Sequence, residues 1–422
     1  MLKIKLTDIV MAFSNSIDMI CPSMAHHHKR VAYIAYQIST QMGLERKDIE
    51  NILIAALLHD CGAIKDDEKL RTGHYDFGIT LSERFAHGFR GWMLLKGLED
   101  FKKPAELIKF HHVYWKEPEP LYIGTDIIPV GSYILHLADR IDIFVNKQKE
   151  VLSQRSFIID TIREDSGKKF MPEAVEAFLE ISSRESFWFD MVTPFLDQLL
   201  IKYLSSIKST INIDKLLLVA GILNKIIDYR SSFTSTHSAG VAECAGALSL
   251  RMGFSNNYVK MMYIAGLLHD LGKLAIPVRI LEKKGPLDKN ELNIMKQHTF
   301  LSYRVLESIP QLTLINQWAS YHHERVDGTG YPFRIGGKDL GLGSRIMAVS
   351  DVFTALTEDR PYRAAMPVNA AIKTMEEMVR ANHLDADVFS ALNQHIEEIN
   401  QLKLNAQKNA VSSFMNLQSS SA

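Results

Sequence analysis

Cysteine is scarce in this chain: Cys21, Cys61 and Cys244 are the three among 422 residues. An odd number of widely spaced cysteines excludes a disulfide framework and a thiolate metal site, and it indicates a reducing compartment. Long hydrophobic runs are missing too, because no stretch of about 18 uninterrupted apolar residues occurs. Residues 1–20 also lack the basic and apolar regions of a signal peptide. We therefore expect a cytoplasmic protein that does not span a membrane.

Neither sign of charge dominates. Lys and Arg total 48 against 49 Asp and Glu, so the chain lacks the basic excess that a nucleic-acid polymer would favour. Strand-like alternation of apolar and polar residues is scarce as well. Apolar residues recur instead at steps of three and four in segments 31–44, 51–60, 216–229 and 261–270. This spacing predicts an all-α fold.

Histidine and aspartate occur in the same order twice. The intervals are 32, 28, 24 and 28 residues in the first copy and 32, 29, 24 and 29 in the second, and ten of the sixteen histidines belong to the two sets. The first set is His27, His59, Asp60, His87, His111, His112 and Asp139; the second is His237, His269, Asp270, His298, His322, His323 and Asp351. Because divalent transition metals favour these ligand types, the repetition predicts a metal site in each half.

Seven ligands exceed what one first-row ion ordinarily takes from protein, and they suit two ions that share a carboxylate. Any one of these histidines alone would more often be a hydrogen-bonded core residue, but the ordered and repeated set favours metal binding. The other histidines are interpreted as facing solvent or lying behind the ligands: His26, His28, His74, His136, His383 and His395.

Three segments surround the second set: HDLGKLAIP (269–277), HHERVDGTGYP (322–332) and RIMAVSDVFTALTEDRPYR (345–363). Over roughly residues 212–405 the chain resembles the HD-GYP family of the HD superfamily of metal-dependent phosphohydrolases. The resemblance implies two tandem HD-type helical bundles joined by a helical connector. It also implies hydrolysis of a cyclic dinucleotide, and the two-domain layout resembles bacterial 3′,3′-cGAMP phosphodiesterases.

The repeat and the resemblance together predict four parts. These are a degenerate HD-like domain (1–150) that retains its metal ligands, a helical connector (151–210), an HD-GYP catalytic domain (211–407) and a tail (408–422). The tail is small and polar, so we expect it to be disordered.

The resemblance also assigns the second set to two metals. His237, His269, Asp270 and Asp351 would hold one, and Asp270, His298, His322 and His323 the other, with Asp270 as the bridge. Some family members hold a third metal through a glutamate four residues before the first histidine; Phe233 stands there in this chain. We therefore expect two metals. The resemblance favours iron or manganese, although the ligands alone admit other divalent ions.

Five further residues are expected to handle substrate. Lys273 lies three residues after Asp270, on the same side of a helix, where it would act with Asp270 in catalysis by neutralising a phosphate oxygen. The resemblance implies that Tyr331 of the GTGYP loop contacts the substrate, and Arg345, Arg360 and Arg363 are expected to contact it too, because arginine suits phosphate and guanine edges. The alternatives are a solvated surface lysine for Lys273, glycines that only shape a turn, and a plain salt bridge for Arg345.

The first set lacks these phosphate-handling residues. Ala63 replaces the lysine, the segment 111–122 has no GYP, and nothing after Asp139 corresponds to DRPYR. We expect this domain to bind metal and to act as a regulatory or dimerising module, for instance as a sensor of a nucleotide or of redox state. An active phosphohydrolase of different specificity is the alternative.

The leading hypothesis is a second-messenger phosphodiesterase of bacteria. It would open 3′,3′-cGAMP, cyclic di-GMP or both to the linear 5′-phosphorylated dinucleotide. The alternatives are a cyclic-dinucleotide receptor that acts through a partner, and an HD nucleotidase or dNTP hydrolase. A homodimer and signalling protein partners are left open by the sequence.

Overall fold

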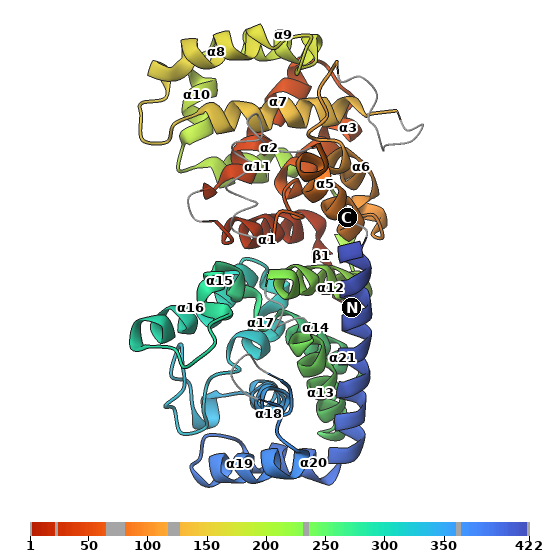
Figure 1. Ribbon diagram of the computed structural model, residues 1–422, viewed down its shortest axis with the longest axis vertical. Helices are drawn as coiled ribbons and strands as arrows, with labels where there is room; N and C mark the ends of the chain where they lie inside the picture. The colour runs from red at the N-terminus through yellow and green to blue at the C-terminus, as the bar shows by residue number, and fades with distance from the viewer. Residues whose placement is uncertain are drawn as a thin grey trace. The chain divides into compact units, whose positions relative to one another are not determined.

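A computed structural model describes residues 2–21, 24–64, 81–116, 127–230, 236–359 and 364–419. The chain forms two compact units, residues 5–210 (the N-terminal unit) and the residues from 211 onward (the C-terminal unit), to which residues 1–4 also belong. Helices make up both units (Figure 1). In the described part, β1 (Ile4–Lys5) and β2 (Thr210–Ile211) form a two-stranded sheet. The predicted all-α fold is confirmed.

The N-terminal unit contains α1 (Leu6–Asp18), α2 (His27–Gln41), α3 (Arg46–Leu58), α5 (Leu81–Leu95), α6 (Lys102–Lys109), α7 (Val130–Phe144), α8 (Arg155–Glu164), α9 (Pro172–Ile181), α10 (Glu185–Val192) and α11 (Leu196–Leu204). Helix α2 packs against α3, α7, α9, α10 and α11. Phe178 and Trp188, from the predicted connector, are fully buried and make an edge-to-face contact with ring centroids 6.2 Å apart. Residues 151–210 thus complete the core of this unit.

The C-terminal unit contains α12 (Ile213–Arg230), α13 (His237–Arg251), α14 (Asn256–Leu268), α15 (Val278–Leu281), α16 (Lys289–Glu307), α17 (Thr313–Ser320), α18 (Leu342–Leu356), α19 (Val368–Arg380), α20 (Ala386–Gln394) and α21 (Ile396–Ser419). Helix α13 packs against α14, α18 and α21, which runs alongside it (Figure 1). A capping box at Asp288 and Glu291 starts α16 by satisfying backbone N–H groups at its first turn.

The sequence repeat is also a structural repeat. Helices α2, α3, α5, α6 and α7 correspond in order to α13, α14, α16, α17 and α18, and each pair carries the same member of the ligand pattern. Because the ligands stand at equivalent places on equivalent helices, the nearly equal intervals reflect helix and loop lengths.

The sequence predicts a disordered tail from residue 408, and in the structure residues 408–419 continue α21. This helix is anchored upstream, where Lys403 and Gln407 are buried against the rest of the unit. Once a helix is nucleated by packing, each further residue adds a hydrogen bond at little cost, so a polar sequence can extend it.

Candidate metal centres

The second ligand set gathers where five helices of the C-terminal unit end or pass. His237 is the first residue of α13, and His269 directly follows α14; Asp270, His298 of α16, His322 and His323 after α17, and Asp351 of α18 complete the set. We call these seven residues the C-terminal cluster. Six of the seven are buried, and His323, with 32% of its side chain exposed, borders solvent.

Asp270 faces both halves of the C-terminal cluster. Its Oδ2 lies 3.2 Å from His269 Nε2 and 3.9 Å from His237 Nε2, whereas its Oδ1 lies 3.4 Å from His298 Nε2. One carboxylate oxygen therefore points to each group of histidines. This is the geometry that a carboxylate bridging two ions requires.

The remaining distances define the two groups. Asp351 Oδ1 lies 3.1 Å from His237 Nε2, and His298 Nε2 lies 3.3 Å from His322 Nε2. His237, His269 and Asp351 offer ligand atoms within 4.8 Å of one another, and so do His298, His322 and His323. The structure thus brings together all seven residues that the sequence predicted, in the two groups that the resemblance implied.

Hydrogen bonds to backbone carbonyls fix which ring nitrogen three of the histidines direct toward the centre of the cluster. Nδ1 of His269 donates to Gly266 O at 2.7 Å, Nδ1 of His298 to Met295 O at 2.7 Å and Nδ1 of His322 to Ala319 O at 2.6 Å. With the proton held on Nδ1, the lone pair of Nε2 faces the centre of the cluster, as in metal-bound histidines.

His237 is held differently, by a carboxylate that the sequence reasoning missed. Its Nδ1 lies 2.8 Å from Glu358 Oε1, and Glu358 Oε2 accepts a hydrogen bond from Gln407 Nε2 of α21 at 3.3 Å. Glu358 stands seven residues after Asp351 and two residues beyond the end of α18. That spacing was the available signal.

The first ligand set forms an equivalent N-terminal cluster: His27, His59, Asp60, His87, His111, His112 and Asp139, all buried. Asp60 Oδ1 lies 3.4 Å from His87 Nε2 and 3.6 Å from His59 Nε2, and Asp60 Oδ2 lies 3.9 Å from His27 Nε2. Asp139 Oδ1 lies 3.2 Å from His27 Nε2. Asp60 therefore takes the central place that Asp270 has in the C-terminal cluster.

The N-terminal cluster also has a missed carboxylate behind its first histidine. Asp142 Oδ2 lies 2.7 Å from His27 Nδ1, and both Asp142 oxygens bind the guanidinium of Arg30. Burial lowers the pKa of His27, but hydrogen bonds to Asp139 and Asp142 outweigh this effect and raise it to about 9. Asp142 follows Asp139 by three residues on α7, on the same helix face.

Two further histidines, interpreted from the sequence as facing solvent or lying behind the ligands, are buried next to the N-terminal cluster. His28 is 1% exposed and its Nε2 lies 4.0 Å from Asp60 Oδ2, so it belongs to the N-terminal cluster. His136 is also buried, and its Nδ1 lies 3.1 Å from the backbone oxygen of His111. His26, at the start of α2, is exposed as expected. Because only convergence of α1, α2 and α3 places His28 beside Asp60, the sequence pattern did not reveal it.

Both clusters fit divalent metal ions. His59 Nε2, Asp60 Oδ2 and His269 Nε2 are buried without a hydrogen-bond partner among the described residues. Each such atom would cost about 1–3 kcal/mol if nothing satisfied it. Burial lowers the pKa of His298 to about 3 and that of His323 to about 4, so both imidazoles are neutral at pH 7, as coordination requires.

Lys273 lies at the C-terminal cluster. Its Nζ is 2.6 Å from Asp270 Oδ2, and only 14% of its side chain is exposed, so it is not a solvated surface lysine. Burial raises the pKa of Asp270, but His269 and Lys273 outweigh this effect and hold it well below its usual range. In the N-terminal unit the equivalent Ala63 is fully buried and carries no charge.

Tyr331 lies at the solvent-facing edge of the cluster. Its ring centroid is 4.9 Å from that of His323, and Lys296 Nζ lies 5.3 Å from the Tyr331 ring. The loop around it is fixed by buried Glu324, whose carboxylate accepts hydrogen bonds from the backbone N–H groups of residues 333–335 at 2.7–3.1 Å. At Gly330 a Cβ would come within 2.4 Å of Glu324 Cα, so this close approach requires glycine.

The arginines contribute less to the described site. Arg345 binds Asp385 Oδ2 at 2.7 Å and the Leu340 carbonyl at 2.7 Å, which is the plain salt bridge considered as its alternative role. Arg360, Arg363, Phe233 and His74 lie outside the described residues.

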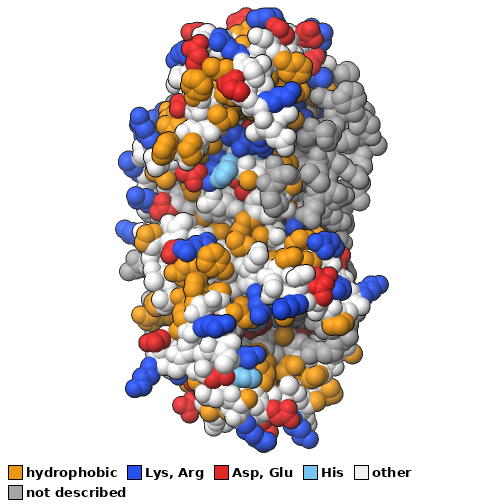
Figure 2. All heavy atoms as spheres, turned by 90° about the vertical axis from the view of Figure 1, so that its left-hand side faces the viewer, with side chains coloured by type: hydrophobic (Ala, Val, Ile, Leu, Met, Phe, Trp, Pro, Cys, Tyr) orange, Lys and Arg blue, Asp and Glu red, His pale blue; other side chains and the backbone are white. Residues whose placement is uncertain are grey.

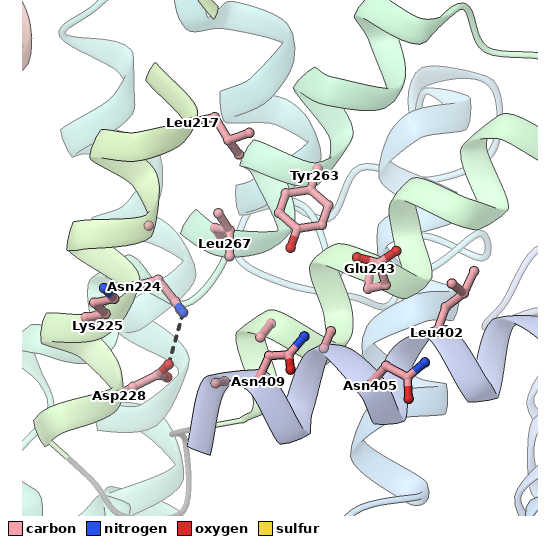
Figure 3. A pocket seen from close by; sticks show the side chains of 14 residues that line it. Leu217, Asn224, Lys225, Asp228, Glu243, Tyr263, Leu267, Leu402, Asn405 and Asn409 are labelled. Carbon is pink, nitrogen blue, oxygen red and sulfur yellow. Dashed lines mark hydrogen bonds between the residues drawn. The ribbon is translucent and has the colours of Figure 1, made fainter. Parts of the chain in front are cut away.

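A cavity of about 560 Å³ lies elsewhere in the C-terminal unit, between α12, α13, α14 and α21 (Figure 3). The residues that line it include none of the seven cluster residues. At its buried end Asn224 donates to Asp228 at 3.0 Å, and burial raises the pKa of Asp228 well above its usual range. Asp228 also interacts electrostatically with His237 and Asp270, so the cavity reaches the neighbourhood of the C-terminal cluster although none of the seven residues lines it.

The surface agrees with the balanced composition. Figure 2 shows Lys and Arg side chains interspersed with Asp and Glu over the face that it draws. Among the described residues, no helix has the length and apolar character needed to cross a membrane.

Comparison with known proteins supports two related domains. HD domain models match residues 24–143 and 221–388. The 3′3′-cGAMP-specific phosphodiesterase 1 of Vibrio cholerae is 28% identical over 95% of this chain and 94% of its own length. A cyclic di-GMP phosphodiesterase of Thermotoga maritima is 38% identical over 39% of this chain and 45% of its own. A crystal structure of a cyclic GMP-AMP specific phosphodiesterase of V. cholerae shares the fold, with a TM-score of 0.66 and 22% identity over 94% of this chain and 98% of that one.

Proposed function

Because this chain belongs to the HD-domain proteins, with one such domain in each half, we propose that its C-terminal unit hydrolyses a cyclic dinucleotide. The substrate is 3′,3′-cGAMP, cyclic di-GMP or both, and the product is the linear 5′-phosphorylated dinucleotide. The observation that carries the proposal is Asp270 with one oxygen toward each histidine group. The near full-length similarity to a 3′3′-cGAMP-specific phosphodiesterase supports the same substrate class.

The C-terminal cluster would hold two divalent ions, which when bound supply Lewis acidity and a water of lowered pKa. Asp270 would bridge the two ions, with His237, His269 and Asp351 on one side and His298, His322 and His323 on the other. We propose iron or manganese as the occupants, since imidazole and carboxylate ligands suit both.

Two other side chains act on the substrate. Lys273 supplies a positive charge beside Asp270 and stabilises the negative charge that develops on the phosphate oxygens. Tyr331, next to the partly exposed His323, offers a ring face and a hydroxyl to the dinucleotide at the open side of the cluster. Arg360 and Arg363 remain predicted substrate contacts.

The N-terminal unit plays a different part. Its cluster has the same ligand types, so we propose that it also binds metal. Ala63 provides no charge where the C-terminal unit has Lys273, and this favours a regulatory or dimerising role over phosphodiester hydrolysis. We assign the degenerate domain to residues 1–150, the connector to 151–210 and the catalytic domain to 211–407. A cytoplasmic location, formation of a homodimer and binding of signalling protein partners stay predictions.

Turnover of three substrates tests the proposal. Reduced, manganese-loaded protein is incubated separately with 3′,3′-cGAMP, cyclic di-GMP and a dNTP mixture. A linear dinucleotide is the expected product, and Asp270→Ala should abolish its formation. Binding of a cyclic dinucleotide without product would indicate a receptor instead, and loss of dNTP alone would indicate a nucleotidase. Either result would contradict the proposal.

A further inference from the structure

We propose that His28 is an additional metal ligand of the N-terminal cluster and that it closes this centre to substrate. The inference rests on the proposed metal binding by the N-terminal unit and does not depend on the activity of the C-terminal unit. The ligand is a divalent transition ion of the kind that imidazole-rich sites take.

The two ring nitrogens of His28 face different carboxylates. Nδ1 lies 2.5 Å from Asp18 Oδ1, and Nε2 lies 4.0 Å from Asp60 Oδ2. The His28 ring centroid is 5.1 Å from that of His59 and 5.5 Å from that of His27. A carboxylate on one nitrogen with the other aimed at the ligand cluster is the usual arrangement of a metal-bound histidine.

Asp18 is itself fixed in place. It is the last residue of α1, and its Oδ2 accepts a hydrogen bond from the backbone N–H of His26 at 3.1 Å. His26, the residue before the first turn of α2, has the left-handed conformation, with φ of 62°. The junction between α1 and α2 thereby holds the Asp18 carboxylate behind His28 and orients its imidazole.

The C-terminal unit has no imidazole at the place of His28, although Asp228 of α12 stands nine residues before His237, as Asp18 stands nine residues before His27. The residue after His237 is Ser238, whose side chain is buried but lacks an imidazole. Asp139 also differs from its counterpart Asp351, because Asp139 Oδ2 is bound by buried Arg140 at 2.6 Å. Valine follows Asp351 in the sequence, so no arginine occupies that position in the C-terminal unit.

These differences decide how many coordination positions stay open. Catalytic metal sites keep a position for water or substrate, whereas structural sites fill theirs with protein ligands. An extra imidazole fills one position in the N-terminal centre. His112 is buried there, whereas its counterpart His323 has 32% of its side chain exposed. The N-terminal centre is therefore closed and structural.

Cobalt binding in the full chain tests this inference. An Asp270→Ala background disrupts the C-terminal centre, so that bound Co²⁺ reports on the N-terminal one. His28→Ser introduces the residue that the C-terminal unit has, Asp18→Asn removes the charge behind His28 but keeps its shape, and His26→Asn is the matched control. Co²⁺ affinity is measured by chelator competition, and the coordination number by the intensity of the visible d–d bands.

We expect His28→Ser to weaken Co²⁺ binding at least about 10-fold and to strengthen the d–d bands, as a lower coordination number does. Asp18→Asn should weaken binding about 10- to 100-fold, the usual effect of losing the partner of a ligating histidine. His26→Asn should change neither quantity.

Unchanged affinity and spectrum in His28→Ser would overturn the role of His28. If that variant does not fold, as judged by circular dichroism, Asp18→Asn decides instead, and wild-type affinity and spectrum there overturn the proposal. Absence of bound Co²⁺ in the Asp270→Ala chain would refute metal binding by the N-terminal unit altogether. Phosphodiesterase turnover of the unmodified chain is measured separately, so failure of the proposed function remains distinguishable.

Discussion

Replacing Glu358 by alanine measures what the carboxylate behind His237 contributes to the C-terminal centre. Glu358 is buried, with one oxygen 2.8 Å from His237 Nδ1 and the other 3.3 Å from Gln407 Nε2. Loss of such a partner ordinarily weakens metal affinity or activity by about 10- to 100-fold. This corresponds to about 1.4–2.7 kcal/mol of binding free energy.

Two milder variants separate charge from position. Glu358→Gln keeps the shape of the side chain and loses its charge, so we expect an intermediate effect. Gln407→Ala removes one long hydrogen bond, in which a neutral amide donates to the Glu358 carboxylate at 3.3 Å, worth about 1 kcal/mol or roughly fivefold. The expected order of damage is therefore Glu358→Ala, then Glu358→Gln, then Gln407→Ala.

The assay is a Mn²⁺ titration of metal-free protein, with turnover of a cyclic dinucleotide and bound metal by elemental analysis as the two readouts. Glu397→Gln, an exposed change on the same helix as Gln407, is the control and should behave as wild type. Wild-type metal affinity in Glu358→Ala would refute the reasoning. Equal damage from Gln407→Ala and Glu358→Ala would show that packing of α21, and not the carboxylate, holds the centre.

Three further predictions concern the C-terminal cluster. Asp270→Ala should lower the metal content of the desalted chain and abolish turnover, because both histidine groups lose the shared carboxylate; full metal content by elemental analysis would contradict the bridge. Lys273→Ala should lower kcat about 100-fold or more with metal content retained, since one charge that stabilises the transition state is lost; an unchanged kcat would return Lys273 to a structural role. Burial lowers the pKa of His298 to about 3, so its contribution to the stability of metal-free protein is full above pH 6.5 and is lost as the pH falls toward 3. Tm measured from pH 7.5 to 4.5 should therefore fall more steeply for wild type than for His298→Asn, and identical slopes would contradict the assignment.

Much of the site was predictable because metal binding requires particular residue types, which the sequence shows directly. Histidine and aspartate at intervals set by helix lengths identified all seven members of the C-terminal cluster. The helical period predicted the all-α fold, and the motif around Lys273 placed that residue beside Asp270. Such inferences succeed when the informative residues lie in a recognisable local pattern.

Residues whose role depends on contacts with distant segments were missed. Glu358 acts on His237, more than a hundred residues away in the sequence, and Gln407 reaches Glu358 only because α21 packs against α13. The polar end of α21 was expected to be disordered, because its composition is small and polar. The packing that anchors the helix upstream cannot be inferred from that composition.

The sequence by itself thus determined the seven repeated ligands of each cluster, their order, and which half carries the lysine. The tertiary structure alone decided that Glu358 lies behind His237, that His28 lies beside Asp60, and that Arg345 pairs with Asp385. The reason is physical. Ligand identity is a property of single residues, whereas the direction of a side chain and the partner behind it depend on how distant helices converge.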